Sequence, residues 1–213
     1  MIRDPSELKK SERYQLLKRL EFDDILNFVL ENIRKRNPVT FLFYLANILF
    51  LAAAIAWIIW SRWQLDTPWK SLILQGAAGL FSGSFLIIPF HEALHALAYK
   101  MMGAPRIHFG KDLRQLLFYV AADRYVINHR ELTLLALTPF IGINALMAVV
   151  TLLFFPQILT FTLFLLLSHN VMCIGDFAMT GFAWEYRRKR IVTYDEMDSK
   201  TSYFYILSKP RGS

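Results

Sequence analysis

Four long stretches with almost no charged residues divide the chain into apolar and polar segments. Each is at least as long as the ~20 residues that a helix needs to cross the hydrocarbon core of a bilayer. We therefore predict four transmembrane helices, at residues 39–60, 71–90, 132–155 and 157–184. Pro156 lies between the last two stretches. Because proline breaks a helix interior, it favours a tight helical hairpin over one continuous helix.

The polar segments around these stretches have patterns of their own. Near the N-terminus, Asp4, Pro5 and Glu7 are typical of a helix start. Apolar residues at helical spacing then predict an amphipathic helix on the membrane surface; they are Phe22, Ile25, Leu26, Val29, Leu30 and Ile33. Residues 105–126 alternate and are rich in β-formers, which indicates a short β-hairpin.

The expected fold is therefore an all-α membrane protein with four transmembrane helices, an N-terminal amphipathic helix and one short β-hairpin in a loop. We divide the chain into an amphipathic segment at residues 1–38, a four-span core at 39–185 that includes the loop 100–131, and a tail at 186–213.

Composition and charge support a membrane protein and argue against a nucleic-acid partner. Apolar residues make up 55% of the chain and charged residues 19%, against about a quarter in soluble domains. The net charge is +7, but 22 of the 24 Lys and Arg lie in the N-terminal segment, the loop 100–131 and the tail. By the positive-inside rule, these three segments are cytoplasmic in a multi-pass protein of the cell membrane. No basic stripe interleaved with aromatic residues indicates binding to DNA or RNA.

His91, Glu92 and His95 form an HExxH motif at the end of the second predicted span. On a helix the two histidines share one face and can bind one zinc ion, while the glutamate can take a proton from water on the metal. Random placement of the residues would produce this motif in roughly 0.4% of chains with this composition. Two packing histidines beside a snorkelling glutamate are the alternative interpretation.

A catalytic zinc needs a third protein ligand. Ala98 and Met101 stand where the extended motif would require glycine and histidine, so that motif is absent. Asp176 is the one acid inside a predicted span. From residue 72 to His91, and from residue 157 to Asp176, the chain runs 19 residues, roughly 28 Å of helix. The two residues therefore lie at one depth, and we predict Asp176 as the third ligand. Glu185 is the reserve candidate, and a salt bridge or a helix-breaking role is the alternative for Asp176.

The remaining histidines, Asn170 and Cys173 have other expected roles. Asn170 is a candidate catalytic residue that donates a hydrogen bond to the scissile carbonyl or the developing oxyanion, or it ties helices together. His169 is expected to support a metal ligand or to pack between helices. His108 and His129 lie in the polar loop and are expected to be solvated. Cys173, the single cysteine, is expected to pack in an apolar environment and cannot form an internal disulfide.

With these residues, the chain resembles the site-2 protease family of intramembrane zinc metalloproteases. The resemblance rests on the motif from His91 to His95 and on residues downstream of it: Ala96, Ala98, Gly103 and the β-like segment 106–110. More narrowly, the chain resembles small membrane zincin peptidases that pair this motif with a later Asn-x5-Asp segment, here Asn170 to Asp176. In site-2 proteases the aspartate is followed by glycine near a proline, whereas here Gly175 precedes Asp176 and the proline is missing.

The resemblance implies hydrolysis of peptide bonds at or within the membrane, with zinc near its cytoplasmic side and a membrane protein or peptide as substrate. An extended substrate is expected to pair with an edge of the hairpin at residues 105–126. Pro89 is expected to kink the helix that carries the motif. Two other functions stay open: a membrane protein in which zinc only braces helices, and a zinc hydrolase of lipids or other amides. The sequence does not indicate the substrate's identity or the oligomeric state.

Overall fold

The computed structural model describes residues 3–112 and 117–208. The chain forms two compact units. The first unit contains Met1–Thr40, Glu92–Thr138 and Asp176–Ser213, and the second contains Phe41–His91 and Pro139–Gly175.

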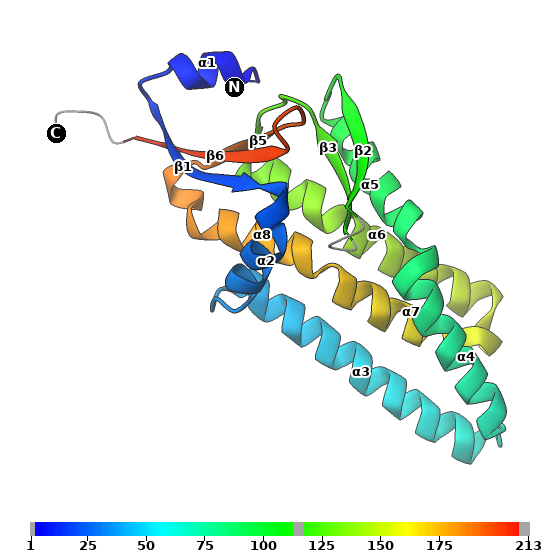
Figure 1. Ribbon diagram of the computed structural model, residues 1–213. Coiled ribbons are helices and arrows are strands. Elements are labelled where there is room, and N and C mark those ends of the chain that lie inside the picture. Colours follow the sequence, from blue (N-terminus) through cyan, green and yellow to red (C-terminus); the bar gives the residue numbers. More distant parts are fainter. Residues whose placement is uncertain (1–2, 113–116, 209–213) are drawn as a thin grey trace. The chain divides into compact units, whose positions relative to one another are not determined.

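A four-stranded antiparallel sheet organises the first unit. Its strand order is β1-β6-β5-β4, so the N-terminal strand pairs with the C-terminal one (Figure 1). The strands are β1 (Tyr14–Glu21), β4 (Ile127–Asn128), β5 (Val192–Glu196) and β6 (Thr201–Leu207). Helix α1 (Pro5–Lys10) precedes the sheet, and Leu8 from this helix joins the buried cluster that also contains Val126, Val192, Tyr194 and Tyr205.

This sheet corrects the expected all-α fold. The protein is mostly helical, with two small antiparallel sheets. The sheet was missed because its partners are distant in sequence: Tyr14 pairs with Leu207 and Glu21 with Thr201. A strand whose hydrogen-bonding partner lies at the other end of the chain carries little local signal beyond its alternation.

The helix start predicted near the N-terminus is confirmed. Asp4 is the N-cap of α1 and its carboxylate accepts a hydrogen bond from Ser6 N, at 2.7 Å. The predicted amphipathic segment forms η1 (Phe22–Asp24) and α2 (Ile25–Ile33). Its apolar residues divide into two sets. Phe22, Val29 and Ile33 are buried, whereas Leu26 and Leu30 are 53% and 41% exposed. Attachment of α2 to a membrane surface stays a prediction.

The predicted hairpin is confirmed as well. Strands β2 (Ile107–Asp112) and β3 (Leu117–Ala122) pair antiparallel, with Phe109 opposite Val120. Residues 113–116, which connect the two strands in the sequence, lie outside the described residues.

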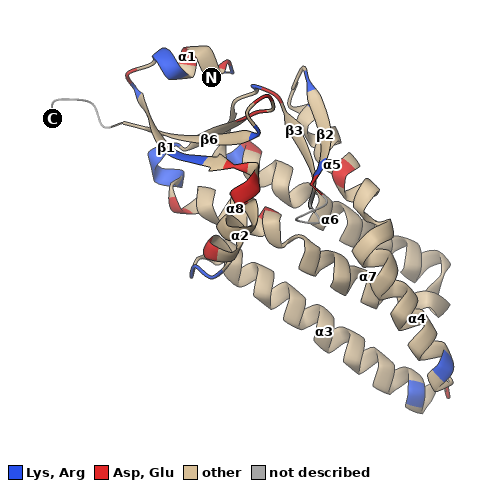
Figure 2. Ribbon diagram, viewed as in Figure 1, with Lys and Arg blue, Asp and Glu red and all other residues tan. Residues whose placement is uncertain are grey.

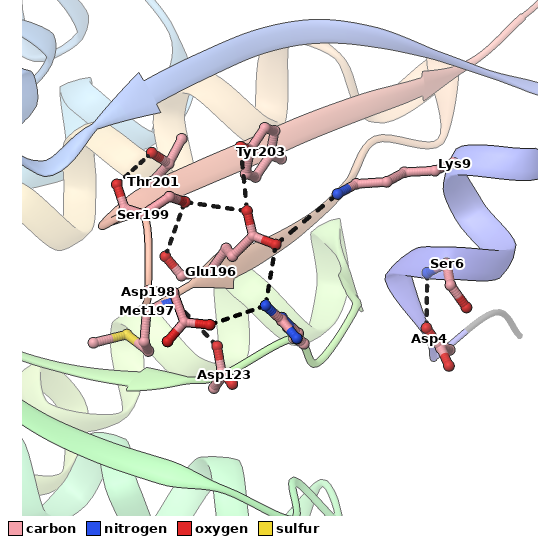
Figure 3. A network of polar contacts seen from close by, with 11 residues as sticks. Asp4, Ser6, Lys9, Asp123, Glu196, Met197, Asp198, Ser199, Thr201 and Tyr203 are labelled. Carbon is pink, nitrogen blue, oxygen red and sulfur yellow. Dashed lines mark hydrogen bonds and ion pairs between the residues drawn. The ribbon is translucent and has the colours of Figure 1, made fainter.

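A network of polar contacts joins α1, the end of β3 and the β5–β6 turn (Figure 3). Glu196 lies 4.0 Å from Lys9 and 3.6 Å from Arg124, and it accepts hydrogen bonds from Ser199 and Tyr203. Arg124 also pairs with Asp198 at 3.0 Å. This network fixes the β5–β6 turn through charges supplied by segments far apart in sequence.

The apolar stretches are helical. Two helices, α3 (Pro38–Gln64) and α6 (His129–Phe154), are each long and apolar enough to cross a membrane. Two bent pairs reach that length only if both parts count as one span, which makes two to four candidate spans. The first pair is α4 (Trp69–Phe81) with the π-helical turn η2 (Ser82–Leu86), followed by α5 (Ile88–Met101); the second is η3 (Pro156–Ile158) with α7 (Leu159–Met172), followed by α8 (Ile174–Glu185).

The surfaces of these helices are compatible with a membrane protein. Figure 2 shows α3, α4 and α7 with few charges, whereas the charged residues gather on α1, α2, the sheets and the loops. Large apolar side chains are exposed along the long helices, including Ile48 at 62% and Phe154 at 67%. Apolar side chains exposed in such number are costly in water, and a bilayer removes that cost.

In the second unit, α4 and η2 pack closely on α7 (Figure 1). Gly79 and Gly83 face this contact, and a methyl group on either would overlap a backbone carbonyl oxygen of α7, that of Phe161 or Leu165. The approach also permits a hydrogen bond of 2.6 Å between the hydroxyls of Ser84 and Ser168. Small residues spaced by four are a common basis of close helix packing in membranes.

We predict that Gly83→Ala destabilises the protein by about 1–3 kcal/mol, because the added methyl group forces backbone displacement. Gly76→Ala is the matched control: it lies in the preceding helix α4, and its methyl group would meet the Phe164 ring at an ordinary 3.6 Å. Thermal unfolding of both purified variants in detergent measures the difference. Equal midpoints for the two variants would contradict this account of the packing.

Candidate metal centre

Helix α5 carries the HExxH motif, with His91 in its first turn and His95 one turn later on the same face. The helix begins after the π-helical turn, in which Ile87 N donates to Ser82 O. Pro89 lies in the first turn of α5, where its missing N–H is not needed. The predicted bend before the motif is confirmed, because α5 is bent away from the preceding helix at this break.

His95 is buried and its imidazole is held at both nitrogens. Nδ1 lies 3.0 Å from the backbone carbonyl oxygen of Leu135. A carbonyl can only accept, so Nδ1 carries a proton, and Nε2 is the nitrogen that could bind a metal. Nε2 faces Asp176, whose Oδ1 is 3.4 Å away. Histidine ligands of zinc are commonly oriented in this way, with the other ring nitrogen fixed by a carbonyl.

The Leu135 carbonyl is available because of a proline. Leu135 lies in α6, four residues before Pro139. In a regular helix, the N–H of residue 139 would donate to the carbonyl of residue 135, but proline has no N–H. The carbonyl that Pro139 leaves without its helical donor is the one that accepts from His95. Sequence reasoning missed this contact, although the proline inside an apolar helix was a usable signal.

The distance between His95 and Asp176 fits a shared zinc ion. Tetrahedral zinc with ligands at 2.0–2.1 Å separates two ligand atoms by about 3.3 Å. The observed 3.4 Å is long for a direct hydrogen bond of this type but close to that separation. Asp176 lies in the first turn of α8, and both side chains are mostly buried. The donor set of an imidazole lone pair and a carboxylate therefore fits zinc.

In the second unit, His91 contacts two residues of α7. Its Nδ1 lies 3.1 Å from Nε2 of the fully buried His169, and that same nitrogen of His169 lies 3.7 Å from Sγ of Cys173, the residue that ends α7. The donor atoms of these three residues lie within 4.8 Å of one another. With Nδ1 of His91 engaged by His169, Nε2 is the nitrogen that would bind a metal on the other side of the ring.

The other predicted residues lie as follows. Glu92 follows His91 on α5 and is half-buried. Glu185, the reserve ligand, forms an ion pair with Lys35 at 3.2 Å at the end of α8. His108 is exposed on β2, and His129 is half-buried at the start of α6. The metal and catalytic roles of these side chains stay predictions.

Asn170 is fully buried in a reciprocal amide pair. Its Oδ1 accepts from Asn144 Nδ2 at 2.7 Å, and its Nδ2 donates to Asn144 Oδ1 at 3.3 Å. These contacts join α7 to α6, which is the helix-tying alternative for this residue. Asn144 is a partner that sequence reasoning did not single out.

A family model described as "putative zincin peptidase" matches residues 84–190, half of the 213-residue chain. The match contains His91, Glu92, His95, Asn170 and Asp176. Zincin peptidases are named for zinc, so the family implies this metal. No curated protein and no solved structure matches the chain.

Replacing the predicted third ligand should release the metal. We predict that Asp176→Asn lowers the zinc content of the purified protein from about one ion per chain to a small fraction of that. Glu185→Gln is the matched control and should keep its zinc, because Glu185 pairs with Lys35. Elemental analysis of both variants measures this. Zinc loss in Glu185→Gln with full zinc in Asp176→Asn would reverse the assignment.

A second prediction concerns Pro139. Pro139→Ala restores a backbone donor for the Leu135 carbonyl and should weaken its hydrogen bond to His95, lowering zinc affinity about 10-fold. The variant should also be more stable to heat, since the proline no longer interrupts α6. Pro105→Ala, in the loop before β2, serves as control. Competition with a chelator of known affinity gives the zinc affinities, and equal values for the two variants would refute the role of Pro139.

Proposed function

The chain belongs to this zincin peptidase family, and we propose that it is a zinc-dependent membrane metalloprotease that hydrolyses peptide bonds at or within the cytoplasmic side of the membrane. The observation that carries the proposal is the His95 imidazole, fixed by the Leu135 carbonyl and directed at the Asp176 carboxylate. Together with His91, one helical turn earlier, these residues would hold the zinc.

Each side chain has a separate task in this mechanism. Zinc bound there would acidify a water molecule and polarise the scissile carbonyl. Glu92 follows His91 on α5 and would accept the proton of the attacking water, then deliver it to the leaving amine. His95 is kept in one tautomer by Leu135, and His169 holds Nδ1 of His91. The hydrogen bonds to both histidines limit the rotation of their rings.

The membrane setting of the proposal rests on two observations. The long helices expose apolar side chains, and two to four of them are candidates for membrane spans. Of the 24 Lys and Arg, 22 lie in the three segments that we assign to the cytoplasm. Peptide hydrolysis is favoured over a purely structural zinc because a glutamate next to the first histidine is needed only for catalysis.

The hairpin β2–β3 supports a role in substrate binding. A two-stranded sheet has two outer edges, and an extended peptide can add to such an edge through backbone hydrogen bonds. Asn170 Nδ2 donates one of its two hydrogens to Asn144, and the other would have to reach the substrate carbonyl from a fully buried position. We therefore assign Glu92 the central catalytic role and keep the oxyanion role of Asn170 as a subordinate proposal.

Removing the proton acceptor should separate binding from catalysis. We predict that Glu92→Gln keeps one zinc per chain but loses peptide cleavage by a factor of at least about 10². Cleavage of a transmembrane peptide library, read by mass spectrometry, measures activity, and elemental analysis measures zinc. Glu185→Gln is the charge-matched control and should stay active. Full activity in Glu92→Gln would exclude this mechanism.

A further inference from the structure

A cavity of about 350 Å³ lies in the first unit, at the start of α6 and apart from the metal centre residues. Its apolar lining includes Leu8, Val126 and Val192, which belong to the buried cluster of this unit. His129, Arg130 and Arg190 supply basic groups to the same cavity. It therefore combines apolar walls with basic side chains.

Within the described residues, neither arginine forms an ion pair. Among residues 3–112 and 117–208, no carboxylate lies within ion-pair distance of the side chain of Arg130 or Arg190. The acid closest in sequence, Glu131, is held by both terminal nitrogens of Arg3, at 2.6 and 3.0 Å. Glu131 also accepts from Asn128 N. Its charge is thus balanced by Arg3, and the cavity keeps an excess of positive charge.

The local backbone supports the same arrangement. Arg190 has a φ of 49°, a left-handed conformation that is uncommon for a residue other than glycine. It follows η4 (Arg187–Lys189), and its N–H donates to Arg187 O. This turn leads directly into β5, so that Ile191 and Val192 line the cavity together with the arginine. A strained residue at the edge of a cavity is a reason to look for a ligand there.

The position of the cavity selects the class of anion. His129 and Arg130 are the first two residues of α6, one of the two helices that can cross a membrane alone. At the end of a membrane span, the phosphates of the lipid head groups are the most abundant anions. The planar guanidinium of arginine binds phosphate oxygens in pairs, and apolar walls suit the glycerol and the first methylenes of a lipid.

We propose that this cavity binds the phosphate of an anionic phospholipid through Arg130 and Arg190. The proposal rests on the membrane location in the proposed function but not on zinc or on peptide cleavage. The bound lipid would fix the start of α6 and the β4–β5 pair against the membrane surface. Because α6 also contains Leu135, the lipid would stabilise the helix that orients His95.

The test uses the full chain, purified in a neutral detergent, and short-chain phosphatidylglycerol as the probe. Isothermal titration calorimetry should show Arg130→Gln and Arg190→Gln each weakening binding about 10-fold. Arg188→Gln is the matched control: it removes the same charge from the adjacent turn and does not line the cavity. Its affinity should change less than about 2-fold. Equal losses of affinity in all three variants would mean that the lipid is attracted by the overall positive charge, and this result would overturn the proposed site.

Two further arms identify the source of the phosphate. Short-chain phosphatidylcholine and inorganic phosphate should both bind at least about 10-fold more weakly than phosphatidylglycerol. Equal binding of inorganic phosphate would assign the cavity to a soluble anion and overturn the lipid. Flotation with vesicles of phosphatidylcholine alone tests the membrane location separately. The wild type and a variant that combines Arg130→Gln with Arg190→Gln should both float. A wild type that stays in solution would overturn the membrane location itself.

Discussion

Hydrocarbon offers no hydrogen bonds, so a polar side chain among apolar helices is stable only when a partner in the protein satisfies it. Several polar side chains of the second unit form facing pairs. Asn144 pairs with Asn170, Thr151 with Thr162, and the Trp57 indole donates to Thr160. Each pair joins two different helices. The candidate metal centre has the same requirement, but its imidazoles and carboxylates cost more free energy to bury than amides or hydroxyls. They must therefore be paired with carbonyls, with one another or with an ion.

Interruptions of the helices provide those partners. A continuous helix consumes its own carbonyls and N–H groups, and it has none to give to a side chain. Here Pro139 frees the Leu135 carbonyl for His95, and the π-helical turn before α5 lets the helix start again three residues before His91. Irregular backbone inside apolar helices is therefore concentrated around the motif. Stability alone would not favour such interruptions, and they support the function that we propose for this site.

The structural features that could be predicted from the sequence are those that depend on a local pattern of residues. The apolar stretches, the cap at Asp4, the hairpin and the bend at Pro89 each have a signal within a few residues. The prediction of Asp176 came from helix length, because equal depth follows from a constant rise per residue. Pairings between distant segments were not predictable in this way. The contact of β1 with β6 and the amide pair of Asn144 and Asn170 have no local signal, since each half looks like an ordinary strand or an ordinary polar residue.

The placement of Asp176 in α8 adds a reason why this acid, rather than Glu185, suits a metal. Asp176 is the third residue of the helix, and Glu185 is the last. The unpaired N–H groups in a helix's first turn favour negative charge, whereas the carbonyls of the last turn disfavour it. The first turn of α8 therefore suits the negative charge that a carboxylate ligand carries. Glu185 has the reverse situation, and Lys35 compensates its charge. The break at Cys173 starts α8 anew and thereby places Asp176, rather than Glu185, in the first turn of a helix.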